Sequence, residues 1–507
     1  MTEIRLLPNL EKNISKKSFD LFEFIIYVKK ERIMAMKDIR NRLAFPFKFI
    51  ILIIIVFELS ALLSATLVFP PDEYARRRAR LMEHIGDGVA IFLGAKTPSG
   101  DYQFYQNNDL IYFCGVEIPN AILAIDGQKK ESILFFTMEE KEAEGEGLSL
   151  SLIREPQKVT GLEKVMPLEQ FPQYISGLNN QGRTVYTMFY PEELMRENSR
   201  EKYNILQKTM VLDLFDQRLT KELQFVFQLR NKFPRLRVED ISAVVWDLRK
   251  YKSPAEIEVL RQAGRIGVKA HRAVIQATRP GVTEKELAAL FEYVCLKEGA
   301  QDLAFYTIIM SGKNHAFGHY HAYDRTLQDG DFVILDAAPD YKYYNVDLST
   351  SFPVNGKFTP RQRELYQKAL LVRQACLNSY RPGITLRQVS EEAKKYLQEK
   401  GLSPDDHDLP GTLRYGGYNH SVGLATHDVQ ATFSGPDEVL KPGYVFSCDI
   451  QVIHPEEQIG IRLEDNIVIT ENGYINLGEG LPRTVEEIEE LMKKDGIIQV
   501  LKKNKVY

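Results

Sequence analysis

Four acidic residues and one histidine in the last third of the chain have the types and settings of metal ligands. Each lies in a stretch rich in apolar and β-branched residues and close to a Gly or Pro, the pattern of a β-strand. A carboxylate buried on a strand is costly unless it is paired or bound to a cation. Together the five would give oxygen-rich ligation for two divalent cations. They are Asp336, Asp347, His420, Asp449 and Glu464.

The elements that must position these residues follow a duplicated plan. Capping boxes predict helix starts at Ser253-Pro254 and at Thr359-Pro360. Each helix runs into the same turn, Arg-Pro-Gly-x-Thr, which begins at Arg279 in the first half and at Arg381 in the second. A second capping box follows each turn. Each half is therefore expected to contain two helices followed by ligand-bearing strands, with the acidic residues on facing strands.

A different pattern precedes this duplicated region. Residues 66–238 alternate short apolar strands with charged helical segments, which is typical of an α/β domain. The segment around Trp246 predicts a linker helix. We expect an amino-terminal α/β domain over residues 66–238 and a second domain, which bears the candidate ligands, over residues 239–507.

Composition excludes several classes of protein. The chain has 507 residues, a formal net charge of −4 and no block of Lys and Arg in the part expected to fold, which argues against a nucleic-acid partner. Its four cysteines lie far apart and form no C-x-x-C pair. They therefore predict neither a zinc ribbon nor a redox motif.

Residues 34–65 have the parts of an export signal: a basic flank, an apolar run over residues 49–57 and a small residue at Ala65. Residues 1–33 would then be an upstream extension. The apolar run is too short for a comfortable membrane span. We expect export to the periplasm or the medium, with membrane contact only through residues 49–65. The alternatives are an uncleaved membrane anchor and, if the segment is not a signal, a cytoplasmic protein.

The ligand-bearing segments resemble those of the pita-bread metallopeptidases, in particular aminopeptidase P and proline dipeptidase. VILDAAPDYKYYNVDLSTSF resembles the family's segment with two metal-binding aspartates, HSVGLATHD its His-x-x-Gly segment, and GIRLEDNIVIT its last ligand segment. YQNNDLIYFCGVEIPNAILAID is similar to the amino-terminal domain of aminopeptidase P. The resemblance implies an α+β protein, in which a creatinase/aminopeptidase P-like α/β domain precedes a duplicated pita-bread metallopeptidase domain.

The resemblance also implies how the metals would be held. Asp347 and Glu464 would bridge two divalent ions, Asp336 would complete the shell of one ion, and His420 with Asp449 would complete that of the other. Mn²⁺ is the expected ion, in agreement with the oxygen-rich ligands, and Zn²⁺ and Co²⁺ are alternatives.

Three further residues would take part in the chemistry by the same resemblance. His319 and His427 would donate hydrogen bonds to the substrate and to the tetrahedral oxyanion. Arg462 is expected on the same strand face as Glu464, because side chains two residues apart on a strand share a face. The three therefore complete the predicted active site.

Three positions depart from the family pattern. Asp449 stands where the family has a Glu, and its carboxylate is one methylene shorter. Metal ligation is sensitive to a few tenths of an ångström, so this difference is expected to affect the binding of the second metal ion. Gly416 stands where aminopeptidase P often has a further histidine, and Gln430 where a Gly is usual. These two bear on the substrate pocket.

The resemblance implies a dinuclear-metal aminopeptidase that removes the first residue from peptides with proline in second position, with a metal-bridging hydroxide attacking the Xaa–Pro bond. Its partners would be proline-containing peptides and, as in relatives of this type, other copies of itself in a homo-oligomer. Two alternatives stay open. One is a proline dipeptidase, and the other is a metal-poor, peptide-binding or non-peptidase member of the fold in which Asp449 does not support two metals.

Overall fold

The computed structural model describes residues 67–97, 104–191, 207–403, 406–409, 419–429 and 435–504. These residues belong to one compact unit, Thr66–Tyr507. The expected export segment and its upstream extension lie outside the described residues, so both stay predictions. Within the described ranges, no helix has the length and apolar character needed to cross a membrane.

The amino-terminal part is built on a six-stranded sheet in the order β4-β3-β2-β1-β5-β6. β2 pairs antiparallel with β1 and β3, whereas β5 runs parallel to β1 and β6. The strands are β1 Val89–Leu93, β2 Ile122–Asp126, β3 Glu131–Phe135, β4 Lys164–Met166, β5 Thr184–Thr187 and β6 Arg237–Asp240. Apolar side chains of this sheet form a buried cluster with those of α8 Phe171–Gln181 and α10 Lys221–Lys232.

Five more helices of the described residues complete this part of the fold. They are α3 Pro71–Ile85, α4 Asn108–Cys114, α5 Glu140–Gly145, α6 Leu150–Arg154 and α7 Pro156–Thr160. The linker helix expected around Trp246 is present as α11 Ser242–Lys250. The alternation of strands and helices confirms the predicted α/β fold class of the amino-terminal part.

The carboxy-terminal part contains a second six-stranded sheet, ordered β13-β14-β12-β9-β8 with β15 also paired to β14. Neighbouring strands in it run antiparallel. Its strands are β8 Ile308–Ser311, β9 Phe332–Asp336, β12 Ser349–Pro353, β13 Val445–His454, β14 Ile459–Thr470 and β15 Gly473–Asn476. A small sheet, β11-β10-β7, is formed by β7 Asp302–Leu303, β10 Pro339–Tyr341 and β11 Tyr344–Asn345.

Two helix pairs confirm the duplicated plan predicted from the sequence. They are α12 Pro254–Ala277 with α13 Glu284–Lys297, and α14 Pro360–Ser379 with α15 Leu386–Glu399. All four helices begin with the predicted capping box, in which a Ser or Thr side chain accepts a hydrogen bond from the third helical residue. Each such cap contributes about 1 kcal/mol. In the turns, Gly281 and Gly383 adopt nearly the same left-handed backbone, with φ of 86° and 84°.

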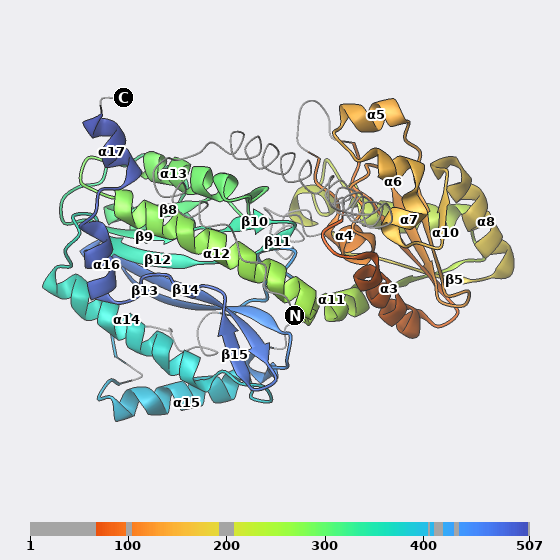
Figure 1. The fold of residues 1–507 in the computed structure, drawn as a ribbon. Coiled ribbons are helices and arrows are strands. Elements are labelled where there is room, and N and C mark those ends of the chain that lie inside the picture. The colour runs from red at the N-terminus through yellow and green to blue at the C-terminus, as the bar shows by residue number, and fades with distance from the viewer. Residues whose placement is uncertain are drawn as a thin grey trace, which may run out of the picture. The chain divides into compact units, whose positions relative to one another are not determined.

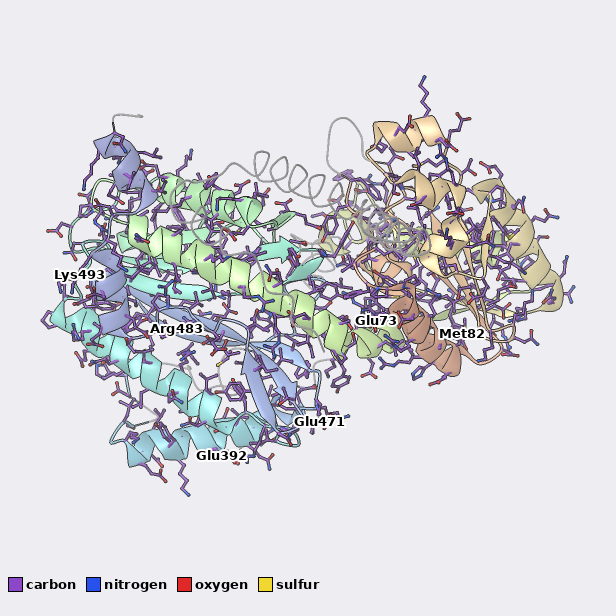
Figure 2. All side chains as sticks on the ribbon, viewed as in Figure 1. Glu73, Met82, Glu392, Glu471, Arg483 and Lys493 are labelled. Carbon is purple, nitrogen blue, oxygen red and sulfur yellow. The ribbon has the colours of Figure 1, made fainter. Side chains whose placement is uncertain are left out.

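These helices pack on the sheet and form the main core. Buried side chains of α12, α13, α14 and α15 join those of β9, β13 and β14 in one apolar cluster. Two further helices, α16 Val485–Met492 and α17 Ile497–Lys503, follow β15 (Figure 1). Arg483, which precedes α16 and is labelled in Figure 2, donates hydrogen bonds to the carbonyl oxygens of Ser349 at 2.7 Å and Glu464 at 2.6 Å. It thereby ties together the backbones of β12 and β14.

Candidate metal centre

Three of the five predicted ligands lie on neighbouring strands of the carboxy-terminal sheet. Ser349 at the start of β12 is opposite Asp336 of β9 on one side and Glu464 of β14 on the other. Glu464 is in turn opposite Asp449 of β13. All three acidic residues are at least 98% buried. Strand register therefore brings together carboxylates from distant parts of the sequence.

The other two ligands do not lie in strands, so the sequence-based expectation for them is wrong. Asp347 lies between β11 and β12, and its backbone N–H donates to Oδ1 of Asn466 at 2.6 Å instead of to a ladder partner. His420 lies in a loop, where its carbonyl accepts a hydrogen bond from the N–H of Ser447 at 2.8 Å. Contacts with β14 and β13 thus replace the strand ladder at both positions.

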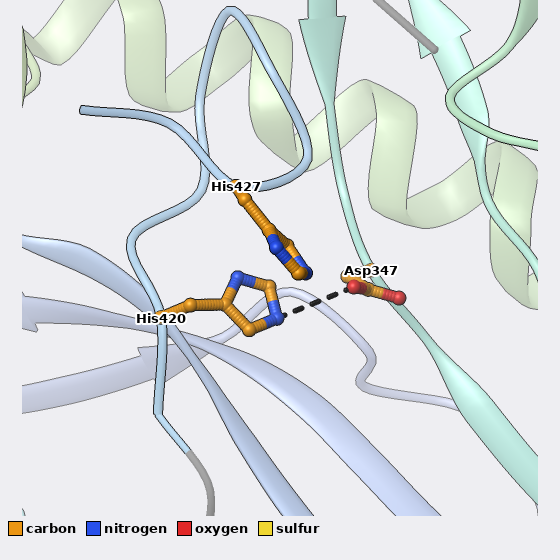
Figure 3. A group of neighbouring side chains, drawn as sticks. All are labelled: Asp347, His420 and His427. Atoms are coloured by element: carbon orange, nitrogen blue, oxygen red, sulfur yellow. Dashed lines mark ion pairs between the residues drawn. The ribbon is translucent and has the colours of Figure 1, made fainter. Parts of the chain in front are cut away.

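The five side chains converge. Asp336, Asp347 and Glu464 each have a carboxylate oxygen within 4.8 Å of the others. His420 extends this group, because its Nε2 lies 3.3 Å from Oδ2 of Asp347 (Figure 3). The same nitrogen lies 3.5 Å from Oε1 of Glu464. Asp449 is connected to this group through Arg462, whose Nη2 lies 2.9 Å from Oδ2 of Asp449 and 3.2 Å from Oε2 of Glu464.

Each of the five predicted ligands has a buried polar atom with no hydrogen-bond partner among the described residues. Buried polar atoms are nearly always satisfied. His420 Nε2 and Glu464 Oε1 lie 3.5 Å apart as an ion pair, so the three aspartate oxygens are the atoms that most need an explanation. Four carboxylate oxygens and one imidazole nitrogen form a donor set that suits hard divalent cations. The donor set therefore fits the metals that the sequence implies. The atoms are Asp336 Oδ1, Asp347 Oδ1, Asp449 Oδ1, Glu464 Oε1 and His420 Nε2.

The pKa values in the site also reflect crowded negative charge. Burial raises the pKa of Asp347 well above its usual range, and the charges of Glu464 and Asp336 raise it further. Burial raises the pKa of Asp449 to about 7, although the charge of Arg462 opposes this shift. Carboxylates in such a site gain stability from a cation.

Two side chains of the protein, those of His420 and Arg462, bring positive charge to this site. Burial lowers the pKa of His420, but the contacts with Asp347 and Glu464 outweigh burial and raise it to about 10. Arg462 lies on the same strand face as Glu464, as predicted, with Nη2 3.2 Å from Oε2 of Glu464. Its guanidinium also forms ion pairs with Asp336 and Asp449. Arg462 thus occupies one oxygen in each of three carboxylates.

The two predicted substrate-side histidines lie near the acidic group. His427 is half-buried, and its ring centroid lies 4.0 Å from that of His420 (Figure 3). Burial lowers the pKa of His427 well below its ordinary value, and the charges of His420, Arg462 and His319 lower it further. His319 is exposed, and its charge also acts on Asp336. The predicted roles of both histidines stay predictions.

The departures from the family pattern have different outcomes. Gly416 and Gln430 lie outside the described residues. Asp449 lies in the β13–β14 ladder opposite Glu464. Whether Asp449 binds metal stays a prediction.

Several residues of the site were missed by the sequence reasoning. Gln451 donates a hydrogen bond to Oδ2 of Asp449. Gln451 lies two residues after Asp449 in the sequence, a spacing that places both side chains on the same face of a strand and could have pointed to this contact. Asp428 directly follows His427 and is buried between Arg249 and Lys252. No short-range sequence signal connects Asp428 with two cations so distant in the chain.

Comparison with known proteins agrees with this geometry. Residues 258–471 match the model of metallopeptidase family M24, and residues 74–186 match the model of the aminopeptidase P amino-terminal domain. The Xaa-Pro aminopeptidase of Escherichia coli is 31% identical over 450 residues, which cover 83% of this chain and 97% of that protein. The chain belongs to metallopeptidase family M24. It is therefore a hydrolase of the aminopeptidase P type, with the pita-bread fold that the sequence predicted.

Other M24 proteins extend the similarity. The Xaa-Pro dipeptidase of Pyrococcus furiosus is 31% identical over 305 residues, which cover 57% of this chain and 82% of the dipeptidase. Among solved structures, proline aminopeptidase P II from Yersinia pestis has a TM-score of 0.67 at 28% identity, with 84% of this chain and 100% of that chain covered. A zinc-substituted E. coli aminopeptidase P in complex with product has a TM-score of 0.67 at 29% identity, covering 84% and 98%. Membership in this family implies divalent metal binding.

Proposed function

We propose that this chain is a dinuclear-metal aminopeptidase that removes the first residue from peptides with proline in second position. The observation that carries the proposal is the convergence of Asp336, Asp347, Glu464 and His420, to which Asp449 is connected through Arg462. Each of the five has a buried polar atom with no hydrogen-bond partner among the described residues. A donor set of this kind is costly to bury unless it binds cations. The similarity to Xaa-Pro aminopeptidases over 83% of the chain supports the reaction and the substrate class.

Mn²⁺ is the ion we propose, because hard oxygen donors predominate in the site. Asp336, Asp347, Glu464, His420 and Asp449 would hold two such ions. When bound, the ions would supply a water of lowered pKa and would polarise the peptide carbonyl. Zn²⁺ and Co²⁺ are the alternatives, and a solved structure of the E. coli aminopeptidase P is described as zinc substituted.

The chain's own residues would bind and orient the peptide. The low pKa of His427 keeps its imidazole neutral at neutral pH, so one ring nitrogen can donate a hydrogen bond to the carbonyl oxygen that becomes the oxyanion. His319, which is exposed, can reach a substrate from the solvent side. Arg462 would keep three carboxylates oriented while these contacts form.

An aminopeptidase is favoured over a dipeptidase by the extent of the similarity. The match to the E. coli aminopeptidase extends over 83% of this chain, whereas the match to the P. furiosus dipeptidase extends over 57%. Residues 74–186 also match an aminopeptidase P domain.

We propose in addition a division into domains near residue 238, assembly into a homo-oligomer, and export directed by residues 34–65. Sequencing of the mature amino terminus would test the export proposal.

Mass-spectrometric analysis of products from a mixed set of Xaa-Pro and Xaa-Pro-Xaa peptides, with added Mn²⁺ and with chelator, tests the proposed function. We expect Mn²⁺-dependent release of the first residue from tripeptides and longer peptides. Cleavage of dipeptides alone would instead identify a proline dipeptidase. No Mn²⁺-dependent cleavage of any peptide would contradict the proposal and favour a peptide-binding role.

A further inference from the structure

The β13–β14 hairpin carries four polar side chains in a square arrangement. Asp449 lies opposite Glu464, and two residues further along β13 Gln451 lies opposite Arg462. Side chains alternate along a strand, so all four project from the same face of the hairpin. Asp449 and Glu464 are buried, whereas Gln451 is exposed. Gln451 and Arg462 also line a cavity of about 210 Å³. Gln451 therefore lies at the boundary between the acidic group and solvent.

The hydrogen bonds to Asp449 fall on a single oxygen. Nε2 of Gln451 donates to Oδ2. Nε of Arg462 donates to the same atom at 3.0 Å, and Nη2 lies 2.9 Å from it. Oδ1 is buried and has no partner among the described residues. The two donors therefore restrain the carboxylate through Oδ2 and leave the lone pairs of Oδ1 available.

Arg462 alone does not restrain Asp449 specifically. Its guanidinium also contacts Asp336 and Oε2 of Glu464, so its position depends on three carboxylates at once. Gln451 acts differently, because among the described residues its amide has Asp449 as its hydrogen-bond partner. The restraint that is specific to Asp449 is thus supplied by Gln451.

We propose that Gln451 is a positioning residue, whose amide holds Oδ2 of the short Asp449 so that Oδ1 is oriented toward a bound metal ion. The carboxylate of Asp449 is one methylene shorter than the Glu it replaces, and ligation tolerates errors of only a few tenths of an ångström. A hydrogen-bond donor that fixes the carboxylate reduces the loss of metal affinity that the shorter side chain would otherwise cause. The inference rests on the part of the proposed function that assigns two metal ions to the site.

Titration of the metal-free protein with Mn²⁺, followed by electron paramagnetic resonance of free Mn²⁺, tests the inference without reference to activity. In Gln451→Ala we expect one of the two binding steps to weaken by about 10–100-fold, the usual effect of removing a group that orients a ligand. The other step should be unchanged. Gln367→Ala removes an exposed glutamine on α14 and is the matched control, with both steps expected as in the wild type.

A double-mutant cycle with Asp449→Glu tests whether Gln451 compensates for the short side chain. Once the longer carboxylate is present, Gln451→Ala should weaken binding much less than it does beside Asp449. Equal effects in the two backgrounds would overturn the inference. So would unchanged binding in Gln451→Ala or a wild type that binds fewer than two ions.

The Mn²⁺ titration and the peptide-cleavage assay together distinguish a failure of this inference from a failure of the proposed function. A wild type that binds two ions but releases no amino acid from Xaa-Pro peptides would contradict the proposed function alone. The effect of Gln451→Ala on Mn²⁺ affinity would still support the positioning role.

Discussion

The imidazole of His420 lies against the carboxylate of Asp347, with Nε2 3.3 Å from Oδ2. Both side chains are almost fully buried. A protonated His420 in this place neutralises part of the acidic charge that bound metal ions would otherwise balance. Protons and metal ions are therefore expected to compete for the site.

This competition predicts the pH dependence of metal binding. Because the pKa of His420 is raised to about 10 by Asp347 and Glu464 against the effect of burial, His420 is protonated at neutral pH in metal-free protein. Ligation requires the neutral imidazole, so binding of the ion that His420 would hold must release a proton. The Mn²⁺ affinity of that binding step should rise by about tenfold per pH unit between pH 6.5 and 8.5. Calorimetric titration across this range would measure it, and a constant affinity would contradict the assignment of His420.

Replacement of Asp347 by asparagine should separate stability from metal binding. The pKa of Asp347 is raised by burial and by Glu464 and Asp336, so its ionised form destabilises the metal-free fold above its ordinary pKa. Asp347→Asn should therefore melt at the same or a higher temperature than wild type in chelator. Saturating Mn²⁺ should raise the wild-type melting temperature, since a ligand that binds the folded state stabilises it. A Mn²⁺-induced shift that persists in Asp347→Asn would argue against its role as a bridging ligand.

Asp428 should position His427 for catalysis. It directly follows His427, accepts a hydrogen bond from Nζ of Lys252 at 3.1 Å, and is ion-paired with Arg249. Asp428→Asn should lower kcat by about 10–100-fold while two Mn²⁺ ions still bind. It should also cost about 3–5 kcal/mol of stability, because Lys252 stays buried without its carboxylate.

Lys252→Met is the companion variant to Asp428→Asn. It removes the lysine charge and leaves the ion pair between Asp428 and Arg249 in place. We expect a smaller fall in kcat and a smaller loss of stability than in Asp428→Asn. Equal kcat in Asp428→Asn and wild type would show that this ion-pair network does not position His427.

His271 should make the fold less stable in acid. Burial lowers its pKa to about 4 from an ordinary 6.5, and its neutral ring contacts Thr350 Oγ1 at 2.9 Å and the carbonyl of Ala337 at 3.0 Å. Between pH 6.5 and 4 the unfolded chain binds a proton that the folded chain does not, so stability falls as pH falls through this window. The loss is on the order of 3 kcal/mol.

Urea unfolding at pH 7.5 and pH 5 would measure the contribution of His271. His271→Gln should lose less stability between the two pH values than wild type does. His84→Gln is the control, because His84 is exposed on α3. An equal pH dependence in His271→Gln and wild type would contradict the assignment.

Local features of the fold were predictable from the sequence. The capping boxes at Ser253 and Thr359 and the turns at Gly281 and Gly383 form as expected. Each depends on groups within three or four residues of one another, so the sequence pattern is sufficient. Asp347 and His420 themselves lie outside strands, although β11 and β12 form on either side of Asp347. The backbone groups there bond to Asn466 and Ser447, which are far away in the chain.

The sequence by itself determined the family, the types of the five candidate ligands and the duplicated helical plan, because these lie in short segments with strong patterns. Only the tertiary structure decided which side chains surround them. The ion pair between Arg462 and Asp336, and the burial of Asp428 between Arg249 and Lys252, depend on contacts between distant segments. Such long-range ion pairs are set by the packing of the whole domain, so the residues next to each partner in the sequence carry no local signal of them.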